Sequence, residues 1–514
     1  MPLSRRALLT GAAAAAGVVV VGACGAPPDT PPAAPRHGGR LRAVFQGGGS
    51  KETLDPHAPR PWVDQARHKA LFDKLTELGD DMTPVPRLAL GWQANPDATV
   101  WRFTLREARF HDGRPVTADD VLASYARILD SAAAGRRGTQ LLGELDLANS
   151  RALDPRTVEL RLRAPVVELP TRLAGTGMAI IPAGTGDFGR PVGSGPFRFE
   201  SFDAGTSSML ATRFDEHWEG APYADQLEIL SAGLQARGNA VLGGQAHYAD
   251  DLDPTFARIH EADGAVRVIR APHSGMQAFA AKVDRPPFDN PDVLGALALT
   301  IDRQRLVDVV LAGKGEIGND LFGKGYQYYA DDLPQRPHDP DQARWLLRRA
   351  GAENLRVTLN TADAGTGFVE AATLLAEQAR AAGITIDLAT VDKDTYFADI
   401  LDNGVLVNES VGAMPIPNHA STHLLSSAAQ NVSRYRSPEF DAAYRNAQAT
   451  GDTGRRTAIY HDMQRRFRDT GGLLVWGHSD WIGATAPALS GAVAAPANTL
   501  NWARFDRVWI GAGA

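Results

Sequence analysis

Residues 355–391 read LRVTLNTADAGTGFVEAATLLAEQARAAGITIDLATV, and this stretch decides the fold class. Its two ends, 355–361 and 384–391, are short runs rich in Val, Ile, Leu and Thr, which is typical of β-strands. The segment between them, 367–382, has apolar residues at helical spacing and stops at Gly383. A strand, a helix and a second strand in this order predict a βαβ unit with parallel strands and a right-handed crossover.

Capping residues predict further helices around this unit. Asp302 precedes a helix that we expect to end near Gly313, and Asp339-Pro340 begins another that ends at Gly351. Thr117 is the expected N-cap of an earlier helix, because acidic residues follow it. Two later helices are predicted at 438–449 and 453–469, and further strands at 41–45, 98–105, 157–163 and 472–478. The fold class is therefore α/β.

Length and composition exclude several classes of protein. A chain of 514 residues is too long for one hydrophobic core, so two or three domains, or one large multilobed body, are expected. The 53 Lys and Arg against 60 Asp and Glu give a net charge of −7, which argues against a nucleic-acid partner. The single cysteine, Cys24, excludes an intramolecular disulfide and a metal site built from thiolates.

The N-terminal residues 1–23 have the pattern of a secretory signal peptide. Arg5-Arg6 resembles a twin-arginine signal, although the general secretory route stays open. The apolar run that follows is too short to span a membrane. Val21-Gly22-Ala23-Cys24 resembles a bacterial lipobox, which predicts a lipidated Cys24 and a protein anchored to the outer face of the cell membrane; the alternative is an ordinary signal peptide with an accidental cysteine. Residues 24–37, rich in Pro and Ala, are expected to form a flexible tether.

Sequence motifs for catalysis and cofactor binding are either absent or match by their letters alone. Gly184–Gly189 matches a dinucleotide fingerprint by its letters, but Arg190-Pro191 follows where a helix should begin, so we expect a loop. The sequence contains no G-x-S-x-G elbow and no H-E-x-x-H motif, which disfavours a secreted hydrolase. His419 and His423, at i and i+4, could hold a transition metal from one helix face, or they could simply line a loop or pocket. We expect no cofactor.

Four further stretches of sequence form a pattern in a fixed order. The first joins Leu54-Asp55-Pro56 to residues 88–92 (LALGW), 103–106 (FTLR), 110–113 (FHDG) and 117–121 (TADDV), the second is 192–197 (VGSGPF) with 214–218 (FDEHW), the third is 287–290 (PFDN) with 296–303 (ALALTIDR), and the fourth is 339–351 (DPDQARWLLRRAG). Together they resemble the large extracytoplasmic solute-binding proteins of ABC importers, the family 5 group that includes oligopeptide-, dipeptide- and nickel-binding proteins. These stretches look like scaffold, and neither His111 nor Asp112 is expected to be catalytic.

The resemblance implies a two-lobed periplasmic-binding-protein fold that closes on a ligand as a flytrap does. We expect lobe I to comprise 38–75, 185–270 and 482–514, and lobe II to comprise 272–480. An extra α+β subdomain, 76–184, is inserted in lobe I. The chain should cross between the lobes near 270–275 and return near 477–482. The protein is then a monomeric binding protein and not an enzyme, and it delivers a small molecule or a peptide to an ABC permease.

Peptide binders of this group use an acidic residue for the amino end of the ligand, after a central strand of the second lobe. The corresponding segment here runs from Asn408 to Met414, and Glu409 is the best candidate for an amine or cation contact. The acidic-Pro pattern common there is missing, with PIPNH at 415–419 in its place. The alternative is that Glu409 is a surface residue.

Other candidate ligand-binding residues are less specific. Gln46 and Gly47 could offer backbone groups to a ligand or form a tight turn. Trp476 could line the pocket or belong to the core, and Asn408, Met414 and His419 complete the expected pocket. We expect a peptide ligand; the alternative is a nickel or haem chelate bound with the help of His419 and His423. The sequence does not identify the ligand.

Overall fold

The structure is a computed structural model that describes residues 34–49, 52–58, 61–130, 136 and 138–511. The predicted signal peptide and Cys24 lie outside the described residues. Residues 35–514 form one compact unit, to which the description below refers. No helix in the described part of the chain is long and apolar enough to cross a membrane.

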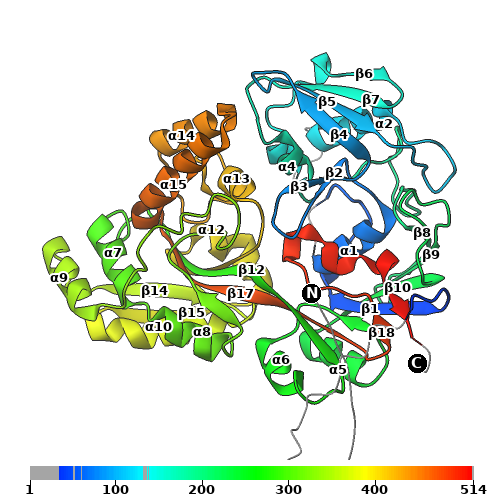
Figure 1. Ribbon diagram of the computed structural model, residues 1–514. Coiled ribbons are helices and arrows are strands. Elements are labelled where there is room, and N and C mark those ends of the chain that lie inside the picture. Colours follow the sequence, from blue (N-terminus) through cyan, green and yellow to red (C-terminus); the bar gives the residue numbers. More distant parts are fainter. Residues whose placement is uncertain (1–33, 50–51, 59–60, 131–135, 137, 512–514) are drawn as a thin grey trace, which may run out of the picture. The chain divides into compact units, whose positions relative to one another are not determined.

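A single eleven-stranded sheet connects the two lobes. Its strand order is β15-β14-β16-β12-β17-β11-β1-β10-β9-β8, with β13 paired to β17. The two central strands, β12 (Arg267–Ala281) and β17 (Leu473–Thr485), pair antiparallel and run from one lobe into the other (Figure 1). The lobes are therefore joined by continuous strands and not only by loops.

Lobe I is built on the strands at one end of this sheet. Helix α1 packs against one face, together with Phe45 and Trp502, whereas α5 and α6 cover the opposite face around Val44. β1 lies inside the sheet, parallel to both β10 and β11. The elements of lobe I are β1 (Arg40–Gln46), α1 (Trp62–Leu71), β8 (Phe197–Asp203), β9 (Ser208–Arg213), β10 (Gln226–Ala232), α5 (Leu234–Leu242), β11 (Tyr248–Ala249), α6 (Pro254–His260), β18 (Leu489–Ser490), η6 (Ala497–Thr499), η7 (Asn501–Ala503), η8 (Phe505–Arg507) and β19 (Trp509–Ile510).

The subdomain has a core of its own beneath a four-stranded antiparallel sheet of order β4-β5-β7-β6. Helix α2 packs on this sheet and begins at Thr117, where the Asp120 carboxylate accepts hydrogen bonds from the Thr117 backbone N–H (2.9 Å) and hydroxyl (2.7 Å). The predicted cap is thus confirmed. The elements are β2 (Thr76–Leu78), β3 (Pro84–Pro86), β4 (Ala89–Ala94), β5 (Val100–Leu105), α2 (Ala118–Leu129), α3 (Gly138–Leu141), η2 (Leu147–Asn149), β6 (Arg151–Asp154), β7 (Thr157–Arg161) and α4 (Leu169–Leu173).

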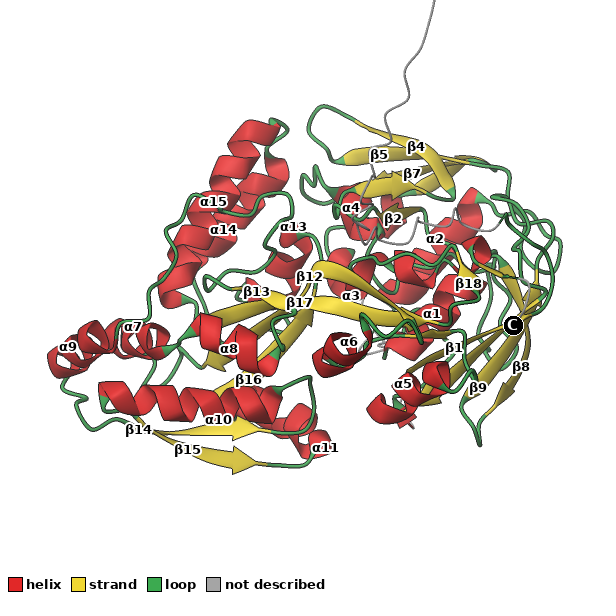
Figure 2. Cartoon of the chain, turned by 60° about the horizontal axis from the view of Figure 1, so that its bottom comes forward, coloured by secondary structure: helices red, strands yellow, loops and turns green. Residues whose placement is uncertain are grey.

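Lobe II contains the predicted βαβ unit. β14 and β15 pair in parallel on either side of α10 in the chain, and α9 begins at Asp339 and ends at the left-handed Gly351, as predicted. Helices α8 and α10 cover one face of the lobe II strands, and α14 and α15 lie on the other (Figure 2). The elements are α7 (Pro291–Thr300), α8 (Arg303–Val310), β13 (Gly315–Ile317), α9 (Pro340–Ala350), β14 (Arg356–Thr361), α10 (Phe368–Ala379), η3 (Arg380–Ala382), β15 (Thr385–Thr390), α11 (Lys393–Thr395), η4 (Tyr396–Ile400), α12 (Leu401–Asn403), β16 (Leu406–Gly412), α13 (Ile416–His419), η5 (Ala420–Leu424), α14 (Pro438–Ala449) and α15 (Thr453–Thr470).

The ladder between β12 and β17 is interrupted at two places, between Ala271 and Gly275 and between Gln277 and Ala278, and the first interruption is the larger. Ala271 pairs with Trp481 and Gly275 with Ser479, so residues 272–274 bulge out of β12. His273 in this bulge has a φ of 54°, which is unusual for a residue with a side chain. A bulge locally disrupts pairing and bends its strand. It falls in the segment where the chain was predicted to cross between the lobes, near 270–275.

The motif residues predicted to be scaffold hold the subdomain against lobe I. The imidazole of His111 accepts a hydrogen bond from the Gly193 N–H (3.2 Å), and its other ring nitrogen donates to the Gly195 carbonyl (2.9 Å). Burial lowers the pKa of His111 to about 4, which keeps the ring neutral and able to bridge both groups. Residues 184–189, which match the dinucleotide fingerprint in sequence, form no dinucleotide site. The segment is a loop, and no helix follows it.

Candidate functional site

The end of β16 is one place where lobe II meets lobe I. The side-chain amide of Asn498, in η6 of lobe I, donates to the carbonyls of Gly412 (3.1 Å) and Ala413 (3.0 Å). A Cβ atom at Gly412 would lie 3.3 Å from the indole of Trp62, the first residue of α1. The described conformation is therefore one in which the lobes touch, with the backbone of 412–413 against α1 and η6.

A cluster of tryptophans forms the lobe I side of this contact. The rings of Trp62 and Trp481 are 4.8 Å apart and edge-on, and Trp502 lies 6.0 Å from Trp481. The indole N–H of Trp481 donates to Asp250 (2.7 Å) at the end of β11. Burial raises the pKa of Asp250 well above its usual range. Trp62 and Trp481 remain half-buried, so they form part of the wall between the lobes.

Gln46 and Gly47 stand at the carboxyl end of β1. Beneath them, Glu52 accepts hydrogen bonds from the Gly48 N–H and the Ser231 hydroxyl (both 2.9 Å), and its other oxygen is 2.7 Å from Arg67. The amide of Gly48 is thus used by the protein itself. Gly47 is packed closely, because a Cβ there would be 3.0 Å from Glu52. The glycines serve the turn, while the half-buried Gln46 and Gly47 stay beside the interlobe wall.

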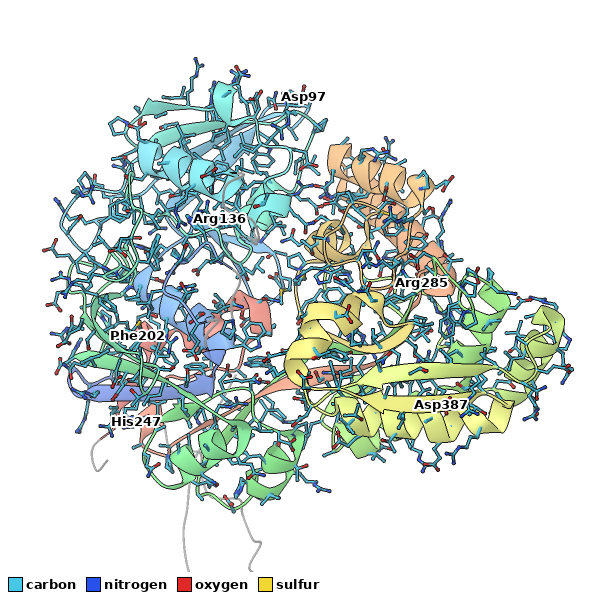
Figure 3. The ribbon with its side chains drawn as sticks, turned by 180° about the vertical axis from the view of Figure 1, so that it is seen from behind. Asp97, Arg136, Phe202, His247, Arg285 and Asp387 are labelled. Carbon is cyan, nitrogen blue, oxygen red and sulfur yellow. The ribbon has the colours of Figure 1, made fainter. Side chains whose placement is uncertain are left out.

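The side chain of Arg67, which supports this turn, is itself fully buried. Its guanidinium also pairs with Asp64 (2.9 Å) and lies 5.0 Å from the ring centroid of Phe202. Phe202, which is labelled in Figure 3, lies on β8. Three separate segments of lobe I therefore fix the position of the turn. A preformed turn loses little conformational entropy when a ligand arrives.

Asn408 and Glu409 lie on opposite faces of β16. Asn408 is buried, and its carbonyl accepts a hydrogen bond from the hydroxyl of Tyr396 (2.6 Å). Glu409 is half-buried, and one of its carboxyl oxygens is shielded from solvent without a hydrogen-bond partner among the described residues. Burial raises the pKa of Glu409 to about 8, although the ammonium of Lys282 pulls in the opposite direction. At neutral pH this carboxyl is mostly protonated and ready to ionise beside an incoming cation.

His419 and His423 are brought together, as their spacing predicted, but in a stack and not as a chelating pair. Their ring centroids are 4.8 Å apart at 18°, and the other face of His419 stacks on Phe322 at 3.7 Å and 7°. Burial holds the pKa of His419 well below its usual range, so its ring is neutral. The described residues contain no group of three His, Cys, Asp or Glu that could hold a metal ion.

His419 also lines a mainly apolar cavity of ≈ 30 Å³ inside lobe II, together with Phe322 and Ile416. Met414, two residues after Gly412, is half-buried at the edge of the same hydrophobic cluster. Trp476 is only 1% exposed and belongs to the core beneath α8, which removes the reason to place it in the pocket wall. Of the predicted pocket residues, Gln46, Gly47 and Met414 are thus half-buried, and Met414 directly follows Ala413, whose carbonyl accepts from Asn498.

Sequence reasoning missed a second contact between the lobes, which we call the interlobe cluster. It consists of Glu168 and Arg172 around α4 of the subdomain with Tyr444, Gln448 and Tyr460 of lobe II, all of them buried. Arg172 donates to Tyr444 (3.1 Å) and Gln448 (3.0 Å), and Glu168 accepts from Gln448 and Tyr460 (both 2.9 Å). Tyr444 and Gln448 are one turn apart on α14, but nothing in the sequence shows which surface they face.

Comparison with known proteins gives the family. Residues 83–433 match the model of the bacterial extracellular solute-binding proteins, family 5. The chain belongs to this family. It is 26% identical over 476 residues to the peptide transport periplasmic protein SapA of Salmonella typhimurium (85% of this chain, 86% of SapA) and 25% identical over 460 residues to the glutathione-binding protein GsiB of Escherichia coli K12 (85% and 87%).

The structure matches that of the ABC transporter-associated periplasmic binding protein DppA of Helicobacter pylori in complex with the peptide STSA. The TM-score is 0.81 at 20% identity, over 92% of this chain and 98% of DppA. The predicted two-lobed fold with its extra subdomain is thereby confirmed. The family-5 protein described here is an extracytoplasmic solute-binding protein and not an enzyme, as predicted.

Proposed function

We propose that this family-5 protein captures a short peptide between its lobes and presents it to the permease of an ABC importer. The observation that carries the proposal is the meeting of the β16 end with Trp62 and Asn498, because main-chain carbonyls and half-buried indoles are groups that a peptide backbone and its side chains can use. The names of SapA and GsiB and the peptide held by DppA support this ligand class.

The position of the ligand between the lobes explains why the lobes would close on it. A peptide between Gln46–Gly47 on lobe I and 412–414 on lobe II contacts both lobes at once, and these contacts exist only when the lobes are closed about the bulge at 272–274. A ligand that binds only the closed state shifts the population toward it. The permease then distinguishes the loaded protein by its closed form.

Glu409 is our candidate for the contact with the peptide's ammonium group. It lies three residues before Gly412, roughly 10 Å along the strand, and the shielded oxygen without a partner offers a place for one N–H donor. Asn408 lies on the opposite face of β16 and is buried, as is His419, so we assign the ammonium contact to Glu409 alone. The ionised form of Glu409 is favoured as soon as a second cation joins Lys282.

The peptide proposal is tested by calorimetric titration of the mature protein with trialanine, N-acetyl-trialanine and a nickel–histidine chelate. We expect trialanine to bind and Glu409→Gln to weaken it by about tenfold, because an ion pair that is mostly shielded from water is lost. N-acetyl-trialanine should bind wild type and variant alike. Glu107→Gln, on the exposed surface of the subdomain, is the matched control. Heat from the chelate but from no peptide would contradict peptide capture and support the metal-chelate alternative.

We further propose that Cys24 is lipidated and anchors the protein to the outer face of the cell membrane. The support is the sequence alone: a lipobox-like VGAC at 21–24 after a short apolar run. Cys24→Ala should release the protein from the membrane fraction into the medium or the periplasm, as seen by fractionation and immunoblotting. Ser4→Ala is the control, and a Cys24→Ala protein that stays with the membranes contradicts the anchor.

A further inference from the structure

A second cavity lies between α1 of lobe I and the subdomain. It measures ≈ 30 Å³, and its polar lining comes from Gln65, His68, Lys69, Lys74, Glu77 and Thr176. Two of these residues are lysines whose side chains are almost completely buried, with 6% of Lys69 and 8% of Lys74 exposed. Two cations beside so small a cavity are costly unless carboxylates compensate them.

Lys69 is compensated. Its ammonium donates to Glu77 (2.5 Å), whose carboxylate also lies 3.1 Å from Arg87. Arg87 in turn pairs with Asp73 (3.1 Å) and Glu219 (2.5 Å). The network continues through Glu219 to Arg504 and Arg507, which share Asp506. It contains four cations, Lys69, Arg87, Arg504 and Arg507, and four carboxylates, Asp73, Glu77, Glu219 and Asp506, so its charges balance without Lys74.

Lys74 has no ion-pair partner of its own, although the carboxylate of Glu77, which it shares with Lys69 and Arg87, favours its charged form. None of the ion pairs in the described part of the chain includes it, and its ammonium donates only to the carbonyls of Ala174 (2.6 Å) and, more weakly, Gly175 (3.5 Å). An ammonium group has three N–H donors, so one is left without a protein acceptor among the described residues while Lys74 lines the cavity. The result is a buried positive charge in excess of the balanced network.

The cavity lies next to the proposed peptide site. Trp62, Gln65 and Lys69 stand at i, i+3 and i+7 of α1 and therefore share one face of the helix. The first of them contacts lobe II at Gly412, and the other two line the cavity. Ala174, two residues before Thr176 of the cavity lining, packs with Ala413 of lobe II in one small hydrophobic cluster. The cavity is thus one or two helical turns away from the interlobe contact.

We propose that this cavity is a subsite for a carboxylate group of the captured solute, with the Lys74 ammonium as its counter-charge. The inference rests on the proposed function and adds the charge of the ligand end that enters lobe I. A carboxylate brings the single negative charge that the network lacks and accepts the remaining N–H of Lys74. The side-chain amide N–H of Gln65 supplies a neutral donor for its second oxygen, while the hydroxyl of Thr176 donates to the side-chain oxygen of Gln65 (3.4 Å). The carboxylate can come from the C-terminus of a peptide or from an acidic side chain.

The first test uses acetate, the carboxylate alone, and does not depend on peptide binding. At equal ionic strength, acetate in place of chloride should raise the Tm of the wild type by about 2 °C or more, since a ligand of the folded state stabilises it. Lys74→Met keeps the length of the side chain without its charge, and acetate should leave its Tm unchanged. Lys393→Met, on the exposed start of α11, is the control and should respond as wild type. Equal acetate shifts in Lys74→Met and wild type would mean that Lys74 serves only the carbonyls of Ala174 and Gly175, and would overturn the proposal.

The pH dependence of the wild type gives a measurement that needs no variant. Burial lowers the pKa of Lys74 to about 8. The ammonium is therefore present below that pH and lost above it, so acetate stabilisation should be constant at lower pH and should disappear as pH rises from about 7.5 to about 9.5. If Lys74→Met fails to fold, this profile decides the matter, and an acetate effect that persists above about pH 9.5 overturns the subsite.

The second test separates the two sources of carboxylate and the two proposals. Trialanine should bind the wild type about tenfold or more tightly than trialanine amide, and Lys74→Met should remove this difference. Equal binding of trialanine and trialanine amide contradicts a C-terminal carboxylate in the cavity and leaves peptide capture intact. In that case, tighter binding of alanyl-alanyl-glutamate amide than of trialanine amide to the wild type assigns the subsite to an acidic side chain. If the wild type shows no such preference, the subsite is overturned. Binding of no peptide contradicts the proposed function, and the acetate test still decides the subsite.

Discussion

Replacing Gly193 with alanine is expected to prevent the accumulation of folded protein. A Cβ at this position would lie 1.9 Å from the carbonyl oxygen of Leu71 and 2.7 Å from the ring of Phe72. The first contact is with backbone at the end of α1, which cannot move without breaking the junction between lobe I and the subdomain. We expect a loss in the free energy of unfolding of about 3 kcal/mol or more, seen as little soluble protein and a much lower Tm by circular dichroism.

Gly186 provides the matched control for this substitution. It lies in the same connection between the subdomain and lobe I, and a Cβ there would meet no atom within 4 Å. Gly186→Ala should therefore fold and melt as the wild type does. Similar Tm values for Gly186→Ala and Gly193→Ala would show that the close approach of Gly193 to Leu71 is not a constraint on the fold.

Replacing Arg172 with methionine is expected to open the lobes and weaken the binding of trialanine. In the closed form, the change leaves the Tyr444 hydroxyl and the side-chain carbonyl of Gln448 without the guanidinium donor of Arg172. In the open form, both groups can reach water instead. The closed state should lose about 2 kcal/mol relative to the open state, more than tenfold in the equilibrium constant. Small-angle scattering of the ligand-free protein should show a larger radius of gyration, and calorimetry should show a higher Kd for trialanine.

Arg156→Met is the control for the interlobe cluster. Arg156 belongs to the same subdomain, but its partner Glu107 is exposed and neither residue touches lobe II. Loss of an exposed pair costs little. An Arg172→Met protein that is as compact as the Arg156→Met control, and binds trialanine as tightly, would mean that closure does not depend on the cluster.

The sequence predicted those elements whose chemistry is local. Asp302, Asp339 and Thr117 cap the helices that they were expected to begin, because an N-cap side chain bonds to backbone only two or three residues away. The βαβ unit of lobe II was predicted correctly for the same reason, since the periodicity of each segment lies in its own residues. β17 is longer than the predicted 472–478, because its second half pairs with lobe I strands that are distant in sequence.

The candidate site depended on contacts that no local pattern contains. Glu168 and Gln448 are 280 residues apart, and only the docking of the subdomain on lobe II brings them together. Trp476 and Trp481 lie on one strand, yet the first is core and the second borders the interlobe wall. The strand pattern identified neither role, since side-chain direction along β17 has meaning only once the helices on each face are known. Lys74 is likewise an ordinary lysine in the sequence, and its lack of an ion-pair partner shows only once the four carboxylates of the network are seen with their own cations.

The interior position of β1 determines the order in which the two lobes can form. β1 pairs with β10, 186 residues later, and the hydrophobic face above both strands is completed by residues between Leu489 and Val508. Lobe II, by contrast, is one continuous segment whose partners are all made before lobe I is complete. A growing chain can therefore assemble lobe II first. The apolar face of β1 stays uncovered until the last residues are synthesised. Exposure of such a face favours aggregation, so chaperone dependence should be concentrated in the half of the protein that is begun first and finished last.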